Sequence, residues 1–385
     1  MRVLVSSTRG AGHFAPLVPF ARACVRAGHE VLAAGPPDLE DAVAAAGLEY
    51  WPFDPPAEEE LGPIWARVPS ASQEEAGQLV VGEIFGRLNT TAALPRLREA
   101  CEEWGPDLVL RESAEFGSAL AAELHGVSHA RVATGLSASE AALLSVAAPA
   151  VDAIRRDAGL GPDPGADALR RSPYLTMFPT ALEDPAQPAE AHTLRFADPA
   201  WEVAPSELPD WWDGAGGPLI YISFGSVAGG YEMAAGAYRA AVEAMDGLDA
   251  RVLLTVGRAA DLSDFASAPP NVHVEAWVPQ ADVLAHAALV VCHGGSGTTL
   301  GSLAAGRPLV VVPLFADQPM NAERVAAAGA GLAVAPEAAA IRAATEEVMA
   351  TPAYRERSEA VAAEMASHPH VDEAVGELER RARLF

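Results

Sequence analysis

The chain has 385 residues, half of them hydrophobic, and its 52 acidic and 26 basic side chains give a formal net charge of −26. So acidic a chain excludes binding to a nucleic-acid backbone, because that interaction needs basic patches that displace counterions. The length favours two domains, each large enough to bury a core.

The basic residues exclude further catalytic mechanisms, and the cysteines indicate the cell compartment. Lysine is absent, which excludes Schiff-base catalysis, pyridoxal-phosphate anchoring and a P-loop lysine. Cys24, Cys101 and Cys292 are scattered, as is typical of a reduced cytoplasm and not of a disulfide framework. The longest apolar stretch, Ala141–Val151, is too short for a bilayer span, and no secretory signal is visible. We therefore expect a cytoplasmic protein without a membrane span.

Short apolar runs alternate with longer helical stretches along the whole chain. The first series of predicted strands is Arg2–Ser7, His29–Ala34, Asp107–Arg111 and Ser128–Ala133, with helices such as Phe14–Ala27 and Ala114–Leu124 between them. The second series is Leu219–Phe224, Arg251–Val256, Val272–Trp277, Leu289–Cys292 and Leu309–Pro313. Strands that are apolar throughout and separated by helices are typical of parallel sheets covered on both faces. Two such series predict two doubly wound α/β domains.

The domain boundaries follow from breaks in this pattern. We expect a Rossmann-like N-terminal domain over 1–205, a linker over 206–217, a Rossmann-like C-terminal domain over 218–368 and a C-terminal helix over 369–385. The linker is rich in Pro, Trp and acidic residues and lacks periodicity. The last segment has apolar residues at helical spacing, so it is expected to dock back on the N-terminal domain. The irregular segment Pro52–Ser72 is predicted to be either a solvated loop or a mobile lip over an acceptor pocket.

The loop after the first strand carries the first candidate catalytic residue. Gly10, Gly12 and Ala15 match the dinucleotide fingerprint G-x-G-x-x-A, but the second strand ends without an acid for a ribose diol. His13 stands where this strand feeds a helix N-terminus, which disfavours the imidazolium form. It is therefore either a general base or a helix-start histidine that only bonds the loop.

A base of this kind works better with an acid that orients it. The strand over Asp107–Leu110 continues into Arg111-Glu112, so its carboxyl end delivers Glu112 to the same sheet edge as His13. The alternative is that Glu112 pairs with Arg111 or caps the next helix.

The second domain carries a longer pattern, from Trp277 to Asn321. The glycines after His293 form a strand-to-helix turn whose backbone N–H groups suit a diphosphate. Trp277 offers a flat face for a pyrimidine base, and Asp317 with Gln318 can bracket sugar hydroxyls. Each of these residues also has a purely structural interpretation: Trp277 as a core residue, the glycines as turn residues and Asp317 as a helix cap.

Together these motifs resemble nucleotide-sugar-dependent glycosyltransferases of the GT-B type, the group that includes plant secondary-metabolite enzymes and bacterial macrolide, aromatic-polyketide and glycopeptide enzymes. The resemblance covers the whole chain and is most specific over Trp277–Asn321. It implies two Rossmann-like domains facing a central cleft. It also implies transfer of a sugar by single displacement, with inversion of the anomeric carbon and without a metal or another cofactor. The donor would be a dTDP-sugar or UDP-sugar and the acceptor a hydrophobic small molecule. The protein would be a monomer or homodimer.

The resemblance also assigns roles to residues of this chain. His13 would be the base and Glu112 its partner. The residues implied in donor binding are Gly12, Ser226, Trp277, Val278, Gln280, His293, Gly295, Ser296, Gly297, Thr298, Asp317 and Gln318.

The chain departs from the family pattern at two places. Plant members carry a glutamate on the ribose hydroxyls where this chain has Gly301, which favours a deoxyribose and hence a dTDP-sugar over a UDP-sugar. The usual acid beside the histidine is aspartate, whereas this chain offers Glu112.

Three other functions compete with glycosyl transfer. A nucleotide-sugar 2-epimerase on the same fold would need acid and base carboxylates around the sugar. An NAD-dependent oxidoreductase would use the first glycine loop but leave Trp277–Asn321 unexplained. A catalytically silent glycosyltransferase-like helper would have no need of His13, Asp317 and Gln318.

Overall fold

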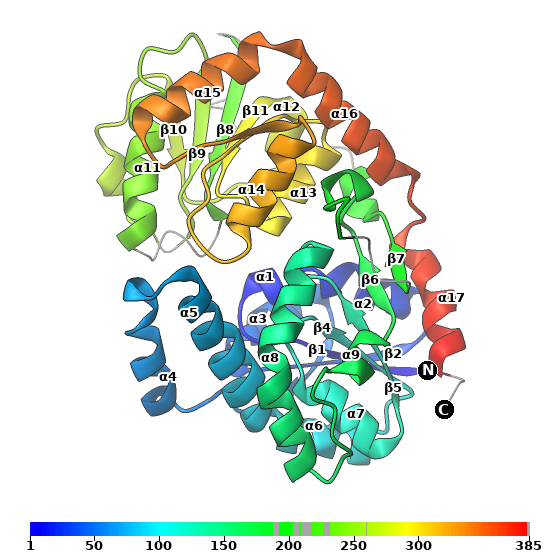
Figure 1. The fold of residues 1–385 in the computed structure, drawn as a ribbon. Coiled ribbons are helices and arrows are strands. Elements are labelled where there is room, and N and C mark those ends of the chain that lie inside the picture. Colours follow the sequence, from blue (N-terminus) through cyan, green and yellow to red (C-terminus); the bar gives the residue numbers. More distant parts are fainter. Residues whose placement is uncertain (188–191, 203–207, 209–216, 226–231, 259, 383–385) are drawn as a thin grey trace. The chain divides into compact units, whose positions relative to one another are not determined.

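The computed structural model describes residues 1–187, 192–202, 208, 217–225, 232–258 and 260–382, and it divides into two compact units (Figure 1). Unit 1 comprises Met1–Thr176, Gln187–Phe196 and Pro369–Phe385. Unit 2 comprises Met177–Ala186 and Ala197–His368. Of the predicted linker, only Leu208 and Gly217 lie within the described residues.

Unit 1 is built on a seven-stranded parallel sheet with the order β3-β2-β1-β4-β5-β6-β7. Its strands are β1 (Arg2–Ser6), β2 (Glu30–Gly35), β3 (Glu49–Pro52), β4 (Leu108–Glu112), β5 (Ser128–Val132), β6 (Tyr174–Thr176) and β7 (Thr193–Arg195). Its helices are α1 (Ala11–Phe14), α2 (Leu17–Arg26), α3 (Glu40–Ala46), α4 (Glu58–Trp65), α5 (Gln73–Gly77), the π-helix η3 (Gln78–Asn89), α6 (Thr90–Glu103), α7 (Gly117–His125), α8 (Ser137–Asp157), α9 (Asp167–Arg170) and α17 (Val371–Ala382), with short 3₁₀ turns η1 (Pro37–Leu39) and η2 (Val68–Ser70). The order changes direction between β1 and β4, and ligands of doubly wound sheets bind at such a switch point.

Unit 2 repeats this plan with a six-stranded parallel sheet in the order β10-β9-β8-β11-β12-β13. Its strands are β8 (Leu219–Ser223), β9 (Arg251–Thr255), β10 (Val272–Glu275), β11 (Ala287–Cys292), β12 (Leu309–Val311) and β13 (Gly331–Ala333). Its helices are α11 (Glu232–Ala244), α12 (Gln280–His286), α13 (Ser296–Ala304), α14 (Gln318–Ala327), α15 (Ala338–Ala350) and α16 (Pro352–Ser367), with 3₁₀ turns η4 (Thr180–Leu182), η5 (Pro199–Glu202) and η6 (Leu262–Phe265). The prediction of two parallel-sheet α/β domains is confirmed.

Both sheets are covered because their strands are apolar on both faces. In unit 1, Leu4 and Val109 pack with Leu97 and Leu120 of the covering helices α6 and α7. In unit 2, the buried strand residues pack with helix residues such as Ile341. Burial of apolar side chains of this kind is the main term that stabilises each unit.

The last helix, α17, belongs to unit 1, as the docking prediction requires. It packs against α2 (Figure 1), and its buried residues are Val371, Ala374, Val375 and Leu378, one face at helical spacing. Two ion pairs, Arg26 with Asp372 and His29 with Glu379, lie in the same unit.

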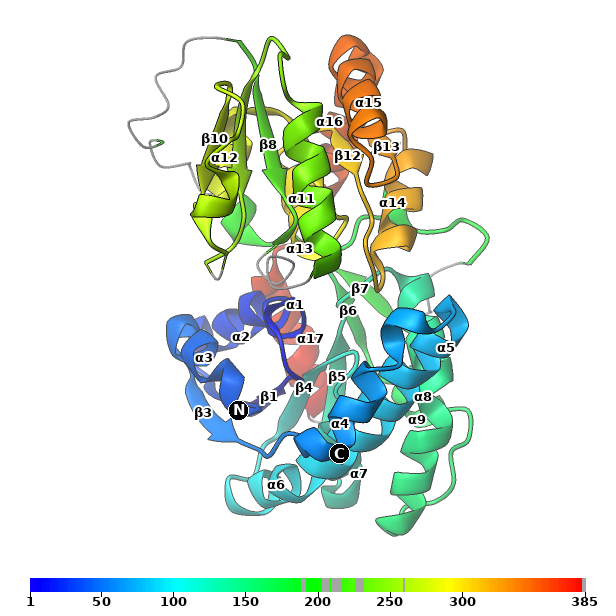
Figure 2. The ribbon, with the colours of Figure 1, turned by 90° about the vertical axis from the view of Figure 1, so that its left-hand side faces the viewer.

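The mobile lip stays a prediction, but the segment Pro52–Ser72 is not a loop throughout, so the loop interpretation was wrong for Glu58–Trp65 and Val68–Ser70. It contains α4, whose first turn holds three glutamates, and acidic side chains stabilise a helix N-terminus. The helices α4, α5 and α8 all contact η3 on one side of unit 1 (Figure 2).

One described helix, α8, is long and apolar enough to cross a membrane by length and composition alone. A core helix meets the same criterion, and the buried face of α8 places Leu144, Ala147 and Val151 in the core of unit 1.

Candidate functional site

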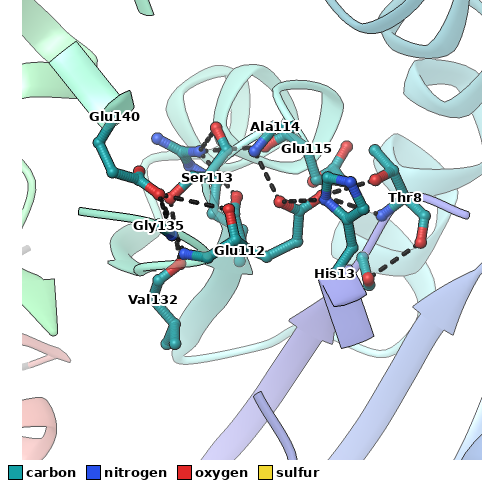
Figure 3. Close-up of polar contacts among 12 residues, drawn as sticks. Thr8, His13, Glu112, Ser113, Ala114, Glu115, Val132, Gly135 and Glu140 are labelled. Carbon is teal, nitrogen blue, oxygen red and sulfur yellow. Dashed lines mark hydrogen bonds and ion pairs between the residues drawn. The ribbon is translucent and has the colours of Figure 1, made fainter. Parts of the chain in front are cut away.

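One group of candidate site residues lies at the carboxyl edge of the unit 1 sheet. Ser6 of β1 is in register with Arg111 of β4, so the residues that follow both strands meet. His13, in α1, brings its Nδ1 to 3.1 Å from Oε2 of Glu112 at the end of β4 (Figure 3). The sequence predicted this pair from the strand order of a parallel sheet.

Glu112 is fully buried, and both of its oxygens are held. Oε1 accepts hydrogen bonds from the Thr8 hydroxyl at 2.7 Å and the Thr8 N–H at 3.2 Å. Oε2 accepts one from the Ala114 N–H at 2.6 Å, in addition to facing His13. Burial alone would raise the pKa of the Glu112 carboxyl, but His13 and the donors from Ala114 and Thr8 together hold that pKa below its ordinary value. The group beside the imidazole is therefore a carboxylate.

The His13 side chain is 25% exposed, unlike its partner. Its ring lies 5.2 Å, centroid to centroid, from the ring of Phe85 in η3. A carboxylate at Nδ1 fixes the proton on that nitrogen and leaves Nε2 as the proton acceptor. The arrangement suits a general base beside an apolar side chain.

A second group of candidate site residues lies in unit 2, where β11 leads into α13. Gly294 has a φ of +84°, and a Cβ there would stand 2.8 Å from Cγ1 of Val311. A Cβ at Gly295 would collide with the ring of His293. These two glycines therefore let the backbone turn tightly into α13, whose N-terminal N–H groups suit an anion. Burial lowers the pKa of His293 to about 4, so its imidazole is neutral at pH 7.

Asp317 and Gln318 open α14 beside this turn. Oδ2 of Asp317 accepts hydrogen bonds from the Ser296 hydroxyl at 3.1 Å and the Asn321 amide at 2.8 Å. Asn321 also donates to the Gly294 carbonyl at 2.8 Å, which ties the turn to α14. Gln318 is buried, and its Oε1 accepts the N–H groups of Leu314 and Phe315 at 2.8 and 3.0 Å. The side-chain amide of Gln318 also carries N–H donors, the type of group that can bind a hydroxyl oxygen.

Trp277 is half exposed, which rules out the core alternative for this residue. The guanidinium of Arg258 lies 4.3 Å from its ring centroid, a cation–π contact. Gln280 begins α12, and its Oε1 would be 3.4 Å from a Cβ placed on Gly301. The sequence difference at Gly301 thus lies next to a predicted donor-binding residue.

The structure places the remaining predicted residues as follows. Val278 and Thr298 are buried, and Gly297 is exposed in the first turn of α13. Gly12 lies in α1 with open space around its Cα. Ser226 lies outside the described residues.

Sequence reasoning missed Thr8, Phe85 and Asn321. Thr8 directly follows a strand that feeds the site, which was a usable signal. Asn321 lies one helical turn after Asp317, at a spacing that brings side chains together. No local signal links Phe85 to His13. Within the described residues, no group of three or more His, Cys, Asp or Glu side chains is placed to hold a metal ion.

Comparisons with known proteins identify the family of the chain. The chain matches the family described as erythromycin biosynthesis protein CIII-like, with its N-terminal domain over residues 22–163 and its C-terminal domain over residues 239–380. The elloramycin glycosyltransferase ElmGT of Streptomyces olivaceus is 32% identical, over 96% of this chain and 94% of that protein. The L-demethylnoviosyl transferase of Streptomyces niveus is 31% identical, over 96% and 95%.

A solved structure extends the likeness to the fold. The glycosyltransferase SsfS6 of Streptomyces sp. SF2575, complexed with thymidine diphosphate, has a TM-score of 0.78 and 25% identity, with 99% of each chain covered. Two parallel-sheet α/β domains of this kind define the GT-B glycosyltransferases. The chain belongs to the erythromycin biosynthesis protein CIII-like family of bacterial natural-product glycosyltransferases. It is therefore a glycosyltransferase of natural-product biosynthesis, and the predicted resemblance is confirmed.

Proposed function

We propose that the chain is an inverting, metal-independent enzyme that transfers a sugar from a dTDP-sugar to a hydrophobic small-molecule aglycone, with His13 as the general base. The observation that carries this proposal is the 3.1 Å contact between Nδ1 of His13 and the buried carboxylate of Glu112. Proton abstraction from an acceptor requires an imidazole nitrogen that takes the proton, and a carboxylate at Nδ1 favours the tautomer in which Nε2 is that atom.

One base is sufficient for the proposed transfer reaction. Nε2 of His13 takes the proton from the acceptor's nucleophilic atom, and that atom attacks C1 of the sugar opposite the diphosphate. The bond between C1 and the diphosphate oxygen breaks, and its electron pair leaves with dTDP. The anomeric configuration therefore inverts. Glu112 stabilises the imidazolium that forms, without taking the proton itself.

The donor would be held by unit 2. The turn after His293 and the N-terminus of α13 supply backbone N–H groups to the diphosphate, whose developing charge they stabilise without a metal ion. Trp277 would stack on the base, and Asp317 would accept a hydrogen bond from a sugar hydroxyl.

Two observations favour thymidine over uridine. Gly301 supplies no carboxylate for a ribose 2′-hydroxyl beside Gln280, and deoxyribose has no such hydroxyl to satisfy. A structural relative of 25% identity was solved with thymidine diphosphate bound.

Mass spectrometry of products tests the proposal. The purified protein is incubated in EDTA with dTDP-sugars or UDP-sugars and a panel of hydrophobic aglycones. The proposal expects glycosides from dTDP-sugars, with little product from His13→Ala. His125→Ala is the matched control, because His125 also lies near a glutamate, Glu102 at 3.7 Å, with a similarly exposed side chain. Loss of product in EDTA, or a His13→Ala variant as active as the control, would overturn the proposal.

A further inference from the structure

Thr8 holds the carboxylate that faces the candidate base. Its hydroxyl is 2.7 Å from Oε1 of Glu112, and its N–H is 3.2 Å from the same oxygen. The Thr8 side chain is 3% exposed. Since an ionised carboxylate only accepts hydrogen bonds, the hydroxyl must donate. Among the described residues, the side chains that contact the Glu112 carboxylate are those of His13 and Thr8, whereas Arg111 donates to the main-chain carbonyl of Glu112.

This contact divides the two oxygens of Glu112 between two tasks. Oε1 is occupied by Thr8, and Oε2 is turned toward Nδ1 of His13 and the Ala114 N–H (Figure 3). The terminal torsion of a glutamate is broad, so each oxygen needs a donor to hold the carboxylate in one orientation. The Thr8 N–H at 3.2 Å is the longer contact on Oε1, and the Thr8 hydroxyl at 2.7 Å is the shorter one.

We infer that Thr8 is a positioning residue for glycosyl transfer, which acts through Glu112 to orient His13 and keep its partner ionised. This inference rests on the proposed role of His13. Thr8 touches neither donor nor acceptor in this scheme, so its effect must appear in the chemistry of the dyad and not in nucleotide affinity.

The effect on pH dependence has a definite sign. The active dyad, with Glu112 charged and His13 neutral, gains most from the Thr8 hydroxyl, because no imidazolium then neutralises the carboxylate. Removing the hydroxyl destabilises this state more than the protonated state, so the acid limb of kcat/KM moves to higher pH. The other charged groups around this end of β4 are Arg111, Glu115, Arg131 and Glu140, and the variants leave all of them in place.

The test compares Thr8→Val, Thr8→Ser and Ser7→Ala. Val keeps the shape and the backbone N–H but loses the hydroxyl, and Ser keeps the hydroxyl. Ser7 is the control, because it is equally buried and its hydroxyl donates to the Thr8 carbonyl at 3.0 Å, not to Glu112. We expect kcat of Thr8→Val to fall about tenfold to a hundredfold, the range for one lost bond to a charged group. Its acid limb shifts upward, its dTDP affinity stays unchanged, and Thr8→Ser restores both rate and profile.

Two results would overturn the inference. One is a Thr8→Val variant with the wild-type rate and pH profile. The other is a slow variant whose profile is unshifted and which Thr8→Ser does not rescue, which is a purely structural effect. If Thr8→Val does not fold, Thr8→Ala takes its place: it must slow the wild-type enzyme, and in the Glu112→Ala background it must change nothing. A His13→Ala variant with normal activity would instead refute the base assignment, so the two failures are distinguishable.

Discussion

Replacing Glu112 by glutamine tests the dyad more sharply than deleting it. All four contacts of this carboxylate come from donors or from the imidazole: the Thr8 hydroxyl and N–H on Oε1, the Ala114 N–H and His13 Nδ1 on Oε2. Glutamine has nearly the same shape but replaces one oxygen with an NH₂ group. Whichever way the amide turns, that group meets a donor where an acceptor is needed.

The expected loss follows from the two orientations. With its NH₂ group toward Thr8, the amide forfeits a charge-assisted hydrogen bond worth about 1.5–3 kcal/mol. With its NH₂ group toward His13, it donates to Nδ1 and moves the imidazole proton to Nε2, the atom proposed to act as base. The wrong tautomer costs about 10⁴ in kcat in the serine-protease triad. We therefore expect kcat of Glu112→Gln to fall by about 10²–10⁴.

The assay is steady-state turnover beside calorimetric titration of dTDP, for wild type, Glu112→Gln and Glu112→Ala. The alanine variant removes orientation without imposing a tautomer, so it should be impaired less than the glutamine variant. Nucleotide affinity should be the same in all three, because the fully buried Glu112 contacts Thr8, Ala114 and His13 and is proposed to act only through the imidazole. A glutamine variant with wild-type turnover would refute the tautomer argument.

Three further predictions concern unit 2. Trp277→Ala should weaken dTDP binding by about 1–3 kcal/mol through loss of the base stack, and equal titration curves for mutant and wild type would exclude the stack. Gly301→Glu should shift the binding preference from dTDP toward UDP, because the new carboxylate can accept a hydrogen bond from the ribose 2′-hydroxyl, a bond worth about 1.5–3 kcal/mol. Tighter binding of UDP than of dTDP by the wild type would contradict this prediction. The pKa of His293 is lowered from 6.5 to about 4 in the folded chain. On acidification the unfolded chain therefore protonates this imidazole before the folded chain does, and the free energy of unfolding should fall as the pH drops from about 6.5 to about 4. Melting curves of His293→Asn should show a smaller fall, and an identical fall would remove His293 as a cause.

The parts of the fold that the sequence predicts are those with enough apolar residues to show a period. The five-residue strands β1 and β4 were predicted within one or two residues of their observed ends. The strands β6, β7 and β13 have three residues each and were missed, because so short a segment is hard to distinguish from a loop. The equally short β12 was predicted, because it begins an apolar run from Leu309 to Pro313. The helix α4 was missed because the glutamates of its first turn suit a loop as well as a helix start and because Pro63 lies inside it.

Some contacts of the candidate site could likewise be predicted from the sequence, and others could not. His13 and Glu112 could be paired from the sequence, because the carboxyl ends of neighbouring parallel strands share one edge. The contact of Phe85 with His13 could not, since it depends on how η3 packs in three dimensions. The use of Gln318 Oε1 by two backbone N–H groups is equally invisible in the sequence, because it depends on the local course of the loop before α14.

The most direct test of the central claim is the anomeric configuration of the product, read by NMR, from a donor of known configuration. Wild type in EDTA should give the opposite configuration at C1 and release dTDP. His13→Ala should form the same product about 10²–10⁴ times more slowly, the scale for losing a general base, while binding dTDP as tightly as wild type. A product with retained configuration, or a His13→Ala variant as fast as wild type, would contradict the account.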